Sequence, residues 1–322
     1  MKKFGIALTA LVLYIWSLPM TAEAAECLVP GGQVVGLELQ NGTVTVAALE
    51  DDPASPARAG GLQVGDVLLT VDGREVSNGE DVRRALERSK GTVTLGLRRQ
   101  GEVLSVQLSP RITEEGPKLG LFLRQGVTGI GTVTWYDPED QTFGTLGHGV
   151  NDSGGDLVRI TGGNAYSARV VAVKKGKAGA PGQLMGTVED LTPIGQLRIN
   201  TEQGVFGTGI GQWQGEAVEL APAEGVKTGS ATILSTVSGA GVREYSVEIL
   251  KIYPKSRQTG RNMLIRITDP ALLETTGGIV QGMSGSPIIQ DGKLVGAVTH
   301  VLVNDPTRGY GIFIENMLDA AA

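Results

Sequence analysis

The feature that most constrains the fold of this 322-residue chain is its 48 glycines, which interrupt short runs of Val, Thr, Leu and Ile along most of its length. Glycine supplies the positive-φ positions that tight turns need, so the pattern predicts short strands joined by turns. No long amphipathic helix is expected between residue 119 and the C-terminal end. Many short strands at regular spacing favour a mainly β fold, a sandwich or a barrel. The length allows two domains.

Residues 31–111 form the first predicted domain, in which a single helix accompanies the strands. Residues 59–73 read Ala-Gly-Gly-Leu-Gln-Val-Gly-Asp-Val-Leu-Leu-Thr-Val-Asp-Gly, and Ser77 and Glu80 have capping-box spacing for the helix that follows. This stretch resembles the core of a bacterial PDZ domain. The resemblance implies a groove in which an extended peptide joins the sheet.

The loop that would present N–H groups to a peptide carboxylate is expected to use a Φ-Gly-Φ sequence, where Φ is an apolar residue. Val35-Gly36-Leu37 is our candidate for this peptide-binding segment, although its match is loose. The alternative is a small β-rich packing domain that binds nothing. A polar linker ends at Pro117, and residues 118–322 form the second predicted domain.

The second domain contains Gly282-Met283-Ser284-Gly285-Ser286-Pro287, followed by an apolar strand. It resembles the nucleophile loop of chymotrypsin-like serine peptidases, Gly-x-Ser-Gly-x-Pro, and makes Ser284 the candidate nucleophile. We expect the N–H groups of Gly282 and Ser284 to form an oxyanion hole. Serine needs a neighbouring base and a group that orients that base.

The chain has only two histidines to supply this base, His148 and His300. His148 lies between two glycines at the end of an apolar segment, and we favour it over His300, which is expected to line the substrate cleft. Asp269 ends a strand before a proline and fits the order His, Asp, Ser, so we expect it to orient His148. Asp137 and Asp190 are its rivals, although both have the sequence context of turn residues.

The N-terminal residues 1–25 combine Lys2 and Lys3, an apolar stretch and Ala22-Glu23-Ala24, which is an A-x-A cleavage pattern. They predict a cleaved signal peptide or an uncleaved membrane anchor, and hence export. The net charge of −6, without a long Lys/Arg run, argues against nucleic acid as a partner. Because no His, Cys, Asp or Glu cluster has metal-ligand spacing, we expect no metal and no cofactor.

The N-terminal segment, the PDZ-like core, Thr-Leu-Gly-His-Gly149, Ile-Thr-Asp-Pro270, the Ser284 loop and Gly-Ala-Val-Thr-His300 together resemble the stage IV sporulation protein B family of serine peptidases. The resemblance implies a PDZ domain followed by a chymotrypsin-like double β-barrel, with His148, Asp269 and Ser284 as the triad. It also implies secretion from the forespore into the intermembrane space. There such a peptidase cleaves itself and a membrane-embedded inhibitor of a sigma-factor-processing protease.

Two other readings of the same residues remain. In one, a PDZ adaptor sits on an inactive peptidase fold and only binds peptides. In the other, a membrane-tethered scaffold cleaves only itself. Met283 also replaces the Asp that usually precedes the nucleophile in chymotrypsin-like enzymes, so a buried N-terminal ion pair to that position is unavailable for activation.

Overall fold

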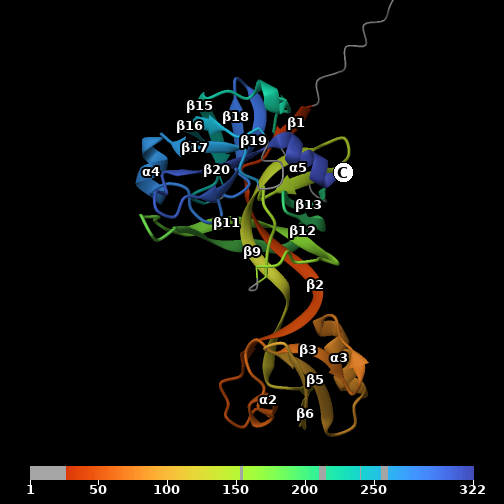
Figure 1. The fold of residues 1–322 in the computed structure, drawn as a ribbon. Coiled ribbons are helices and arrows are strands. Elements are labelled where there is room, and N and C mark those ends of the chain that lie inside the picture. Colours follow the sequence, from red (N-terminus) through yellow and green to blue (C-terminus); the bar gives the residue numbers. More distant parts are fainter. Residues whose placement is uncertain (1–26, 153–154, 210–214, 240, 255–259) are drawn as a thin grey trace, which may run out of the picture.

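The computed structural model describes residues 27–322 except 153–154, 210–214, 240 and 255–259. Figure 1 shows two β-barrels side by side, with a smaller module below them at the far end of two long strands. The predicted segment 1–25 lies outside the described residues. Among those described, no helix is long and apolar enough to cross a membrane.

The first barrel and its flanking strands are formed by two stretches of chain, one before the smaller module and one after it. They are β1 (Cys27–Pro30), β2 (Val34–Leu49), β9 (Leu121–Asp137), β10 (Thr142–Thr145), β11 (Gly162–Lys174), β12 (Gln183–Thr201), β13 (Gly204–Gly209) and β14 (Val218–Glu219). The pairings run β9–β10–β13–β12–β11–β2 and return from β2 to β9, which closes a ring. Its interior contains the fully buried Phe143 and Val205.

The second barrel is closed by strands in the order β15–β16–β17–β20–β19–β18. A short 3₁₀ turn, Ala223–Gly225, precedes it. Its elements are β15 (Gly229–Ser235), β16 (Arg243–Ile252), β17 (Met263–Ile267), α4 (Pro270–Thr276), β18 (Pro287–Gln290), β19 (Lys293–Val301), β20 (Arg308–Phe313) and α5 (Ile314–Ala321). Its core is apolar and fully buried, as at Met263, Ile265 and Ile288. The mainly β, chymotrypsin-like double barrel expected from the sequence is thus confirmed.

The PDZ module is an insertion between β2 and β9 of the first barrel. Its own elements are α2 (Pro56–Ala59), β3 (Val67–Val71), β4 (Arg74–Glu75), α3 (Gly79–Arg88), β5 (Val93–Arg99), β6 (Glu102–Leu108), β7 (Arg111–Thr113) and β8 (Gly116–Lys118). The far ends of the two long strands complete it, since β2 from Val44 onward and β9 up to Gln125 pair there. A separate apolar core joins Val44 to Leu123.

This insertion corrects the expected boundaries of both domains. Residues 34–39 were assigned to the PDZ domain, but they pair with β9 and β11 inside the first barrel. The module instead extends past residue 111 to the start of β9. A sequence reading that assumes one domain follows another cannot detect two strands that serve both.

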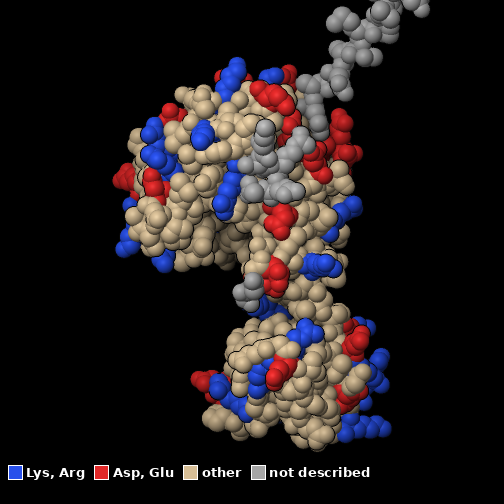
Figure 2. Space-filling view, viewed as in Figure 1, with Lys and Arg blue, Asp and Glu red and all other residues tan. Residues whose placement is uncertain are grey.

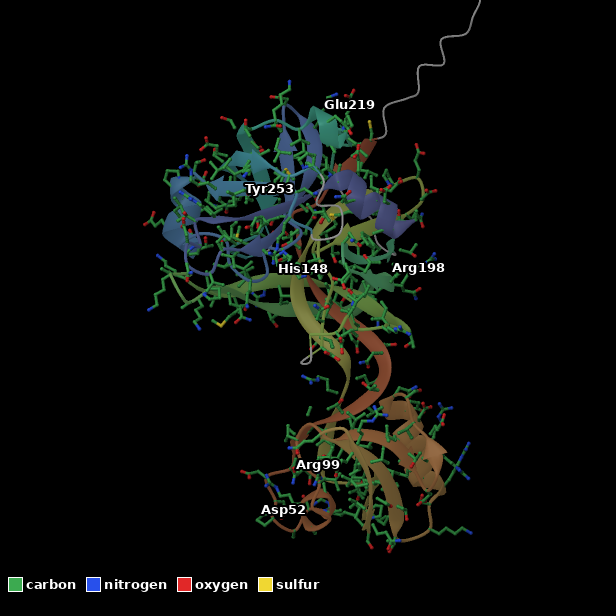
Figure 3. The ribbon with its side chains drawn as sticks, viewed as in Figure 1. Asp52, Arg99, His148, Arg198, Glu219 and Tyr253 are labelled. Atoms are coloured by element: carbon green, nitrogen blue, oxygen red, sulfur yellow. The ribbon has the colours of Figure 1, made fainter. Side chains whose placement is uncertain are left out.

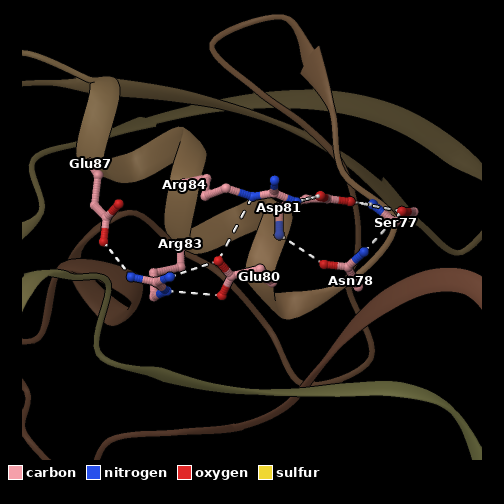
Figure 4. Close-up of polar contacts among 7 residues, drawn as sticks. All are labelled: Ser77, Asn78, Glu80, Asp81, Arg83, Arg84 and Glu87. Atoms are coloured by element: carbon pink, nitrogen blue, oxygen red, sulfur yellow. Dashed lines mark hydrogen bonds and ion pairs between the residues drawn. The ribbon is translucent and has the colours of Figure 1, made fainter.

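Two polar features fix the module's geometry. Asn78 caps α3 by accepting the Asp81 N–H at 2.8 Å, Ser77 donates to the Asp81 carboxylate, and ion pairs follow along the exposed face (Figure 4). Asp66, only 1% exposed, accepts two hydrogen bonds from Arg99, at 2.7 and 2.6 Å. The Arg99 guanidinium lowers the pKa of Asp66, so this carboxylate is charged at neutral pH.

Candidate active site

The Ser284 loop belongs to the second barrel, but β9 of the first barrel positions it. Thr132 donates its N–H to the Ser284 carbonyl at 3.1 Å and its hydroxyl to the Gly282 carbonyl at 2.7 Å. Thr134 donates its hydroxyl to the Gly285 carbonyl at 2.8 Å. Gly285 has φ +96°, and a Cβ there would lie 2.1 Å from the Thr132 carbonyl oxygen, so only glycine fits. The nucleophile loop is therefore clamped at the junction of the two barrels.

The two predicted oxyanion donors have no acceptor inside the protein. Gly282 has φ +98°, and within the described part of the chain neither its N–H nor that of Ser284 donates a hydrogen bond. Gly282 and Ser284 both line the same pocket. Two unpaired main-chain donors beside a hydroxyl are the arrangement that stabilises a tetrahedral oxyanion.

The Ser284 hydroxyl donates to the Thr299 carbonyl at 2.8 Å. No hydrogen bond joins it to His148 among the described residues. Attack on a substrate therefore requires the hydroxyl to leave Thr299 and turn toward a base. Rotation about χ1 is the movement that a serine side chain has for such a change.

His148 follows β10, and its ring is partly buried in the pocket that contains Ser284. Its Nδ1 lies 2.8 Å from the Gly149 carbonyl oxygen. Because a carbonyl only accepts, Nδ1 carries the proton in this contact and Nε2 is left as an acceptor. Burial lowers the pKa of His148, and the Gly149 carbonyl opposes that shift. His148 is thus a neutral imidazole with a free basic nitrogen.

His300 ends β19, and its ring centroid lies 5.1 Å from that of His148. Its Nδ1 is buried and has no hydrogen-bond partner in the described residues. The pKa of His300 is lowered to about 4, mainly by burial and to a smaller extent by the nearby His148 and Arg261. Both histidines therefore line the site as neutral rings, and among the described residues a hydrogen-bond partner fixes the tautomer of His148 but not that of His300.

The pocket around these groups has a volume of about 400 Å³ and is mainly apolar. Figure 2 shows a hollow in the surface of the upper body, where Figure 3 labels His148. Its lining comes from both barrels: Leu37, Leu39, Val127, Thr128, Gly129, Ile130, Leu146, His148, Val150, Ile279, Val280, Gln281, Gly282, Ser284, Thr299, His300 and Val301. Such an apolar lining favours uncharged groups in whatever ligand the pocket holds.

The structure does not bring Asp269 to this pocket, which corrects its expected role. Its carboxylate accepts the Leu272 N–H at 2.9 Å and the Ser246 N–H at 3.4 Å, which makes it the N-cap of α4. Its rivals Asp137 and Asp190 do not line the pocket either, and each accepts an N–H group of its own turn. Among the described residues no carboxylate bonds to either histidine, and the Gly149 carbonyl is the group that orients His148.

The predicted peptide-binding segment Val35-Gly36-Leu37 is wrong. It lies in the middle of β2, where β9 and β11 pair with its two edges. Val35 and Leu37 are 1% and 3% exposed and belong to the core of the first barrel. A strand paired on both sides has no N–H groups left for a peptide carboxylate.

The Φ-Gly-Φ sequence that fits the role better is Leu119-Gly120-Leu121, between β8 and β9, and it lies outside the segment expected from the sequence. Gly120 has φ +74°, and a Cβ there would lie 2.7 Å from Ser55 Cβ. The N–H groups of Leu119 and Gly120 donate to no acceptor in the described structure. Helix α3 lies beside the start of β9, with Gly79 next to Gln125. The sequence signal was present, but the insertion moves this loop to the end of the module.

Comparison with known proteins assigns both parts. Residues 115–318 match the family described as SpoIVB peptidase S55, and residues 52–99 match a PDZ domain. The chain belongs to the SpoIVB peptidase S55 family. It combines the region of this peptidase family with a PDZ module, as the sequence resemblance indicated.

Shorter similarities connect the chain to proteins described as putative zinc metalloproteases. One from Agrobacterium fabrum is 37% identical over 95 residues, which is 29% of this chain and 23% of that protein. One from Rhizobium meliloti is 35% identical over 81 residues, or 25% and 22% of the two chains. This chain spans about a quarter of those relatives. In the part of it that the structure describes, no group of three or more His, Cys, Asp or Glu could hold a metal ion.

Proposed function

We propose that this protein is an exported serine endopeptidase that cleaves itself and then a membrane-associated regulatory protein, and so triggers late mother-cell sigma-factor activation during sporulation. The observation that supports the peptidase chemistry best is the shared pocket of Ser284, His148 and the free N–H groups of Gly282 and Ser284. The family assignment supports the sporulation role.

In the proposed reaction, Ser284 Oγ turns from the Thr299 carbonyl toward His148 Nε2, which accepts its proton as Oγ attacks the peptide carbonyl. The N–H groups of Gly282 and Ser284 stabilise the resulting oxyanion. His148 then donates the proton to the leaving amine. Water hydrolyses the acyl-enzyme by the same steps, with His148 again as the base. The Gly149 carbonyl keeps His148 in the required tautomer.

The proposed target is a membrane-embedded inhibitor of a sigma-factor-processing protease, reached from the intermembrane space through the N-terminal segment as anchor or after its release. The PDZ module supplies no catalytic group, so it delivers or masks peptide segments. The mainly apolar pocket is consistent with a substrate that offers uncharged residues at the scissile bond.

N-terminal sequencing of wild type beside Ser284→Ala tests this function. We expect the wild type to lose part of its N-terminal segment, and Ser284→Ala to keep everything beyond any signal-peptidase site. Purified wild type should also cleave the Ser284→Ala protein in trans. Identical termini and no cleavage in trans would favour the alternative, a peptide-binding adaptor on an inactive peptidase fold.

A further inference from the structure

Strand β9 joins the two functional parts of the molecule. It runs without interruption from Leu121, in the PDZ module, to Asp137, in the first barrel (Figure 1). Along residues 121–132 one edge pairs with β2. On the other edge of β9, no strand of the described chain pairs with residues 121–132, and pairing with β10 starts only at Val133. About eleven residues of main chain are thus open to a partner strand.

This open edge leads directly to the nucleophile. Val133 N–H points toward the β2 side and donates to Gln33, whereas Thr132 N–H points to the open side and donates to the Ser284 carbonyl. Because strand N–H groups alternate between edges, those of Ile130 and Thr128 also face the Ser284 side. Both residues line the catalytic pocket.

The opposite end of the same edge begins at the Leu119-Gly120-Leu121 loop. Its free N–H groups suit a terminal carboxylate, and the half-buried Leu121 and Leu123 pack on the same core as Val82 and Leu86 of α3. A PDZ module binds a C-terminal peptide by adding it as a strand beside such a loop.

We propose, on the basis of the function above, that β9 is one continuous docking edge, on which the C-terminal tail of a substrate lies from the PDZ groove to Ser284. With its carboxylate at Gly120, the tail runs antiparallel to β9. Its upstream residues therefore reach Ile130 and the catalytic pocket. The scissile bond lies upstream of the docked C-terminus, and the tail is the product that β9 retains after acyl transfer.

The proposal fixes a distance along the substrate. Gly120 and Ile130 are ten positions apart in the chain, which corresponds to roughly 33 Å of extended strand. The edge bends at Gly126, whose φ is +57°. A polar pocket of about 220 Å³ lies at this bend, between Gln125 and Gly126 of β9, residues 40–43 of β2, Thr161, and Ser77 and Asn78 before α3. Between scissile bond and C-terminus we therefore expect about ten to twelve residues.

The test uses the full chain and synthetic peptides. The starting peptide is one that the wild type cleaves and Ser284→Ala does not. It is extended on the C-terminal side of its scissile bond by tails of about 4, 8, 12 and 16 residues, and each tail ends in Val as a free acid or as an amide. We expect kcat/KM for the acid to exceed that for the amide by about tenfold at 12 and 16 residues, and to equal it at 4.

A second peptide series tests strand pairing itself. N-methyl groups placed at successive positions of the 12-residue acid tail should lower kcat/KM at every second position, because only alternate N–H groups face β9. An acid-to-amide ratio that does not depend on tail length, or a flat N-methyl profile, would overturn the docking edge and leave the peptidase function intact. Peptides that are never cleaved would overturn both.

Discussion

Replacing Asp269 by Asn separates two accounts of the catalytic histidine. In the triad expected from the sequence, the Asp269 carboxylate orients His148 and stabilises its imidazolium. In the structure it caps α4 through Leu272 N–H and Ser246 N–H. An Asn Oδ1 can still accept the Leu272 N–H, and only the longer bond from Ser246 N–H to the second carboxylate oxygen is lost. We therefore expect Asp269→Asn to keep its activity within a few fold.

The magnitudes of the two outcomes differ widely. Asn and Asp are about equal as N-caps, so Asp269→Asn should change the free energy of unfolding by only a few tenths of a kcal/mol. Asp269→Ala removes the cap and should cost about 1 kcal/mol. Loss of a triad acid lowers kcat by about four orders of magnitude, equivalent to roughly 5 kcal/mol of transition-state stabilisation.

The assay is Ser284-dependent hydrolysis of a fluorogenic ester, measured beside the thermal midpoint of each protein. Asp269→Ala is the matched variant, since it should lose stability without losing chemistry at temperatures where it is folded. A thousandfold lower kcat in an Asp269→Asn protein with the wild-type midpoint would refute our reading. It would return Asp269 to the triad.

Two more predictions concern a pKa and an ion pair. His148 must be neutral to accept the serine proton, and burial lowers its pKa below the ordinary 6.5. The midpoint of the acidic limb in a plot of kcat/KM against pH should therefore lie below pH 6.5. A midpoint above pH 6.5 would contradict the burial argument. Asp66→Asn leaves Arg99 without its carboxylate, and should destabilise the PDZ module by about 2 to 3 kcal/mol, since Arg99 is partly exposed. In denaturant unfolding, the transition of the PDZ module should shift to lower denaturant concentration, while hydrolysis of a small ester stays near the wild-type rate. An unshifted transition would show that the Asp66–Arg99 pair is dispensable.

The sequence was sufficient for the elements whose signal is local. The glycines of the Ser284 loop permit its turn, so a short motif predicts the nucleophile loop. The Gly65-Asp66 turn lies in a short PDZ-like stretch, so a second short motif predicts the PDZ module. The many short strands indicated a mainly β fold, a sandwich or a barrel, and the double barrel was implied by the family resemblance. These inferences depend on residues that are neighbours in the chain.

The errors arise where distant residues decide the outcome. Val35-Gly36-Leu37 fits Φ-Gly-Φ locally, but only the pairing with β9 and β11 reveals that both edges are occupied. Asp269 before Pro270 was interpreted as a strand end. The same pair is a common helix start, with Pro at the first helical position, and that local signal was available.

The central claim, that Ser284 is a nucleophile activated by His148, is tested most directly by reaction with a fluorophosphonate probe, followed by mass analysis of the labelled peptide. We expect one phosphonyl group on Ser284 in wild type, none in Ser284→Ala, and greatly slowed labelling in His148→Ala. Ser284→Ala should also lose roughly four to six orders of magnitude in turnover. Labelling of Ser284→Ala at the wild-type rate, or an active Ser284→Ala protein, would contradict the account.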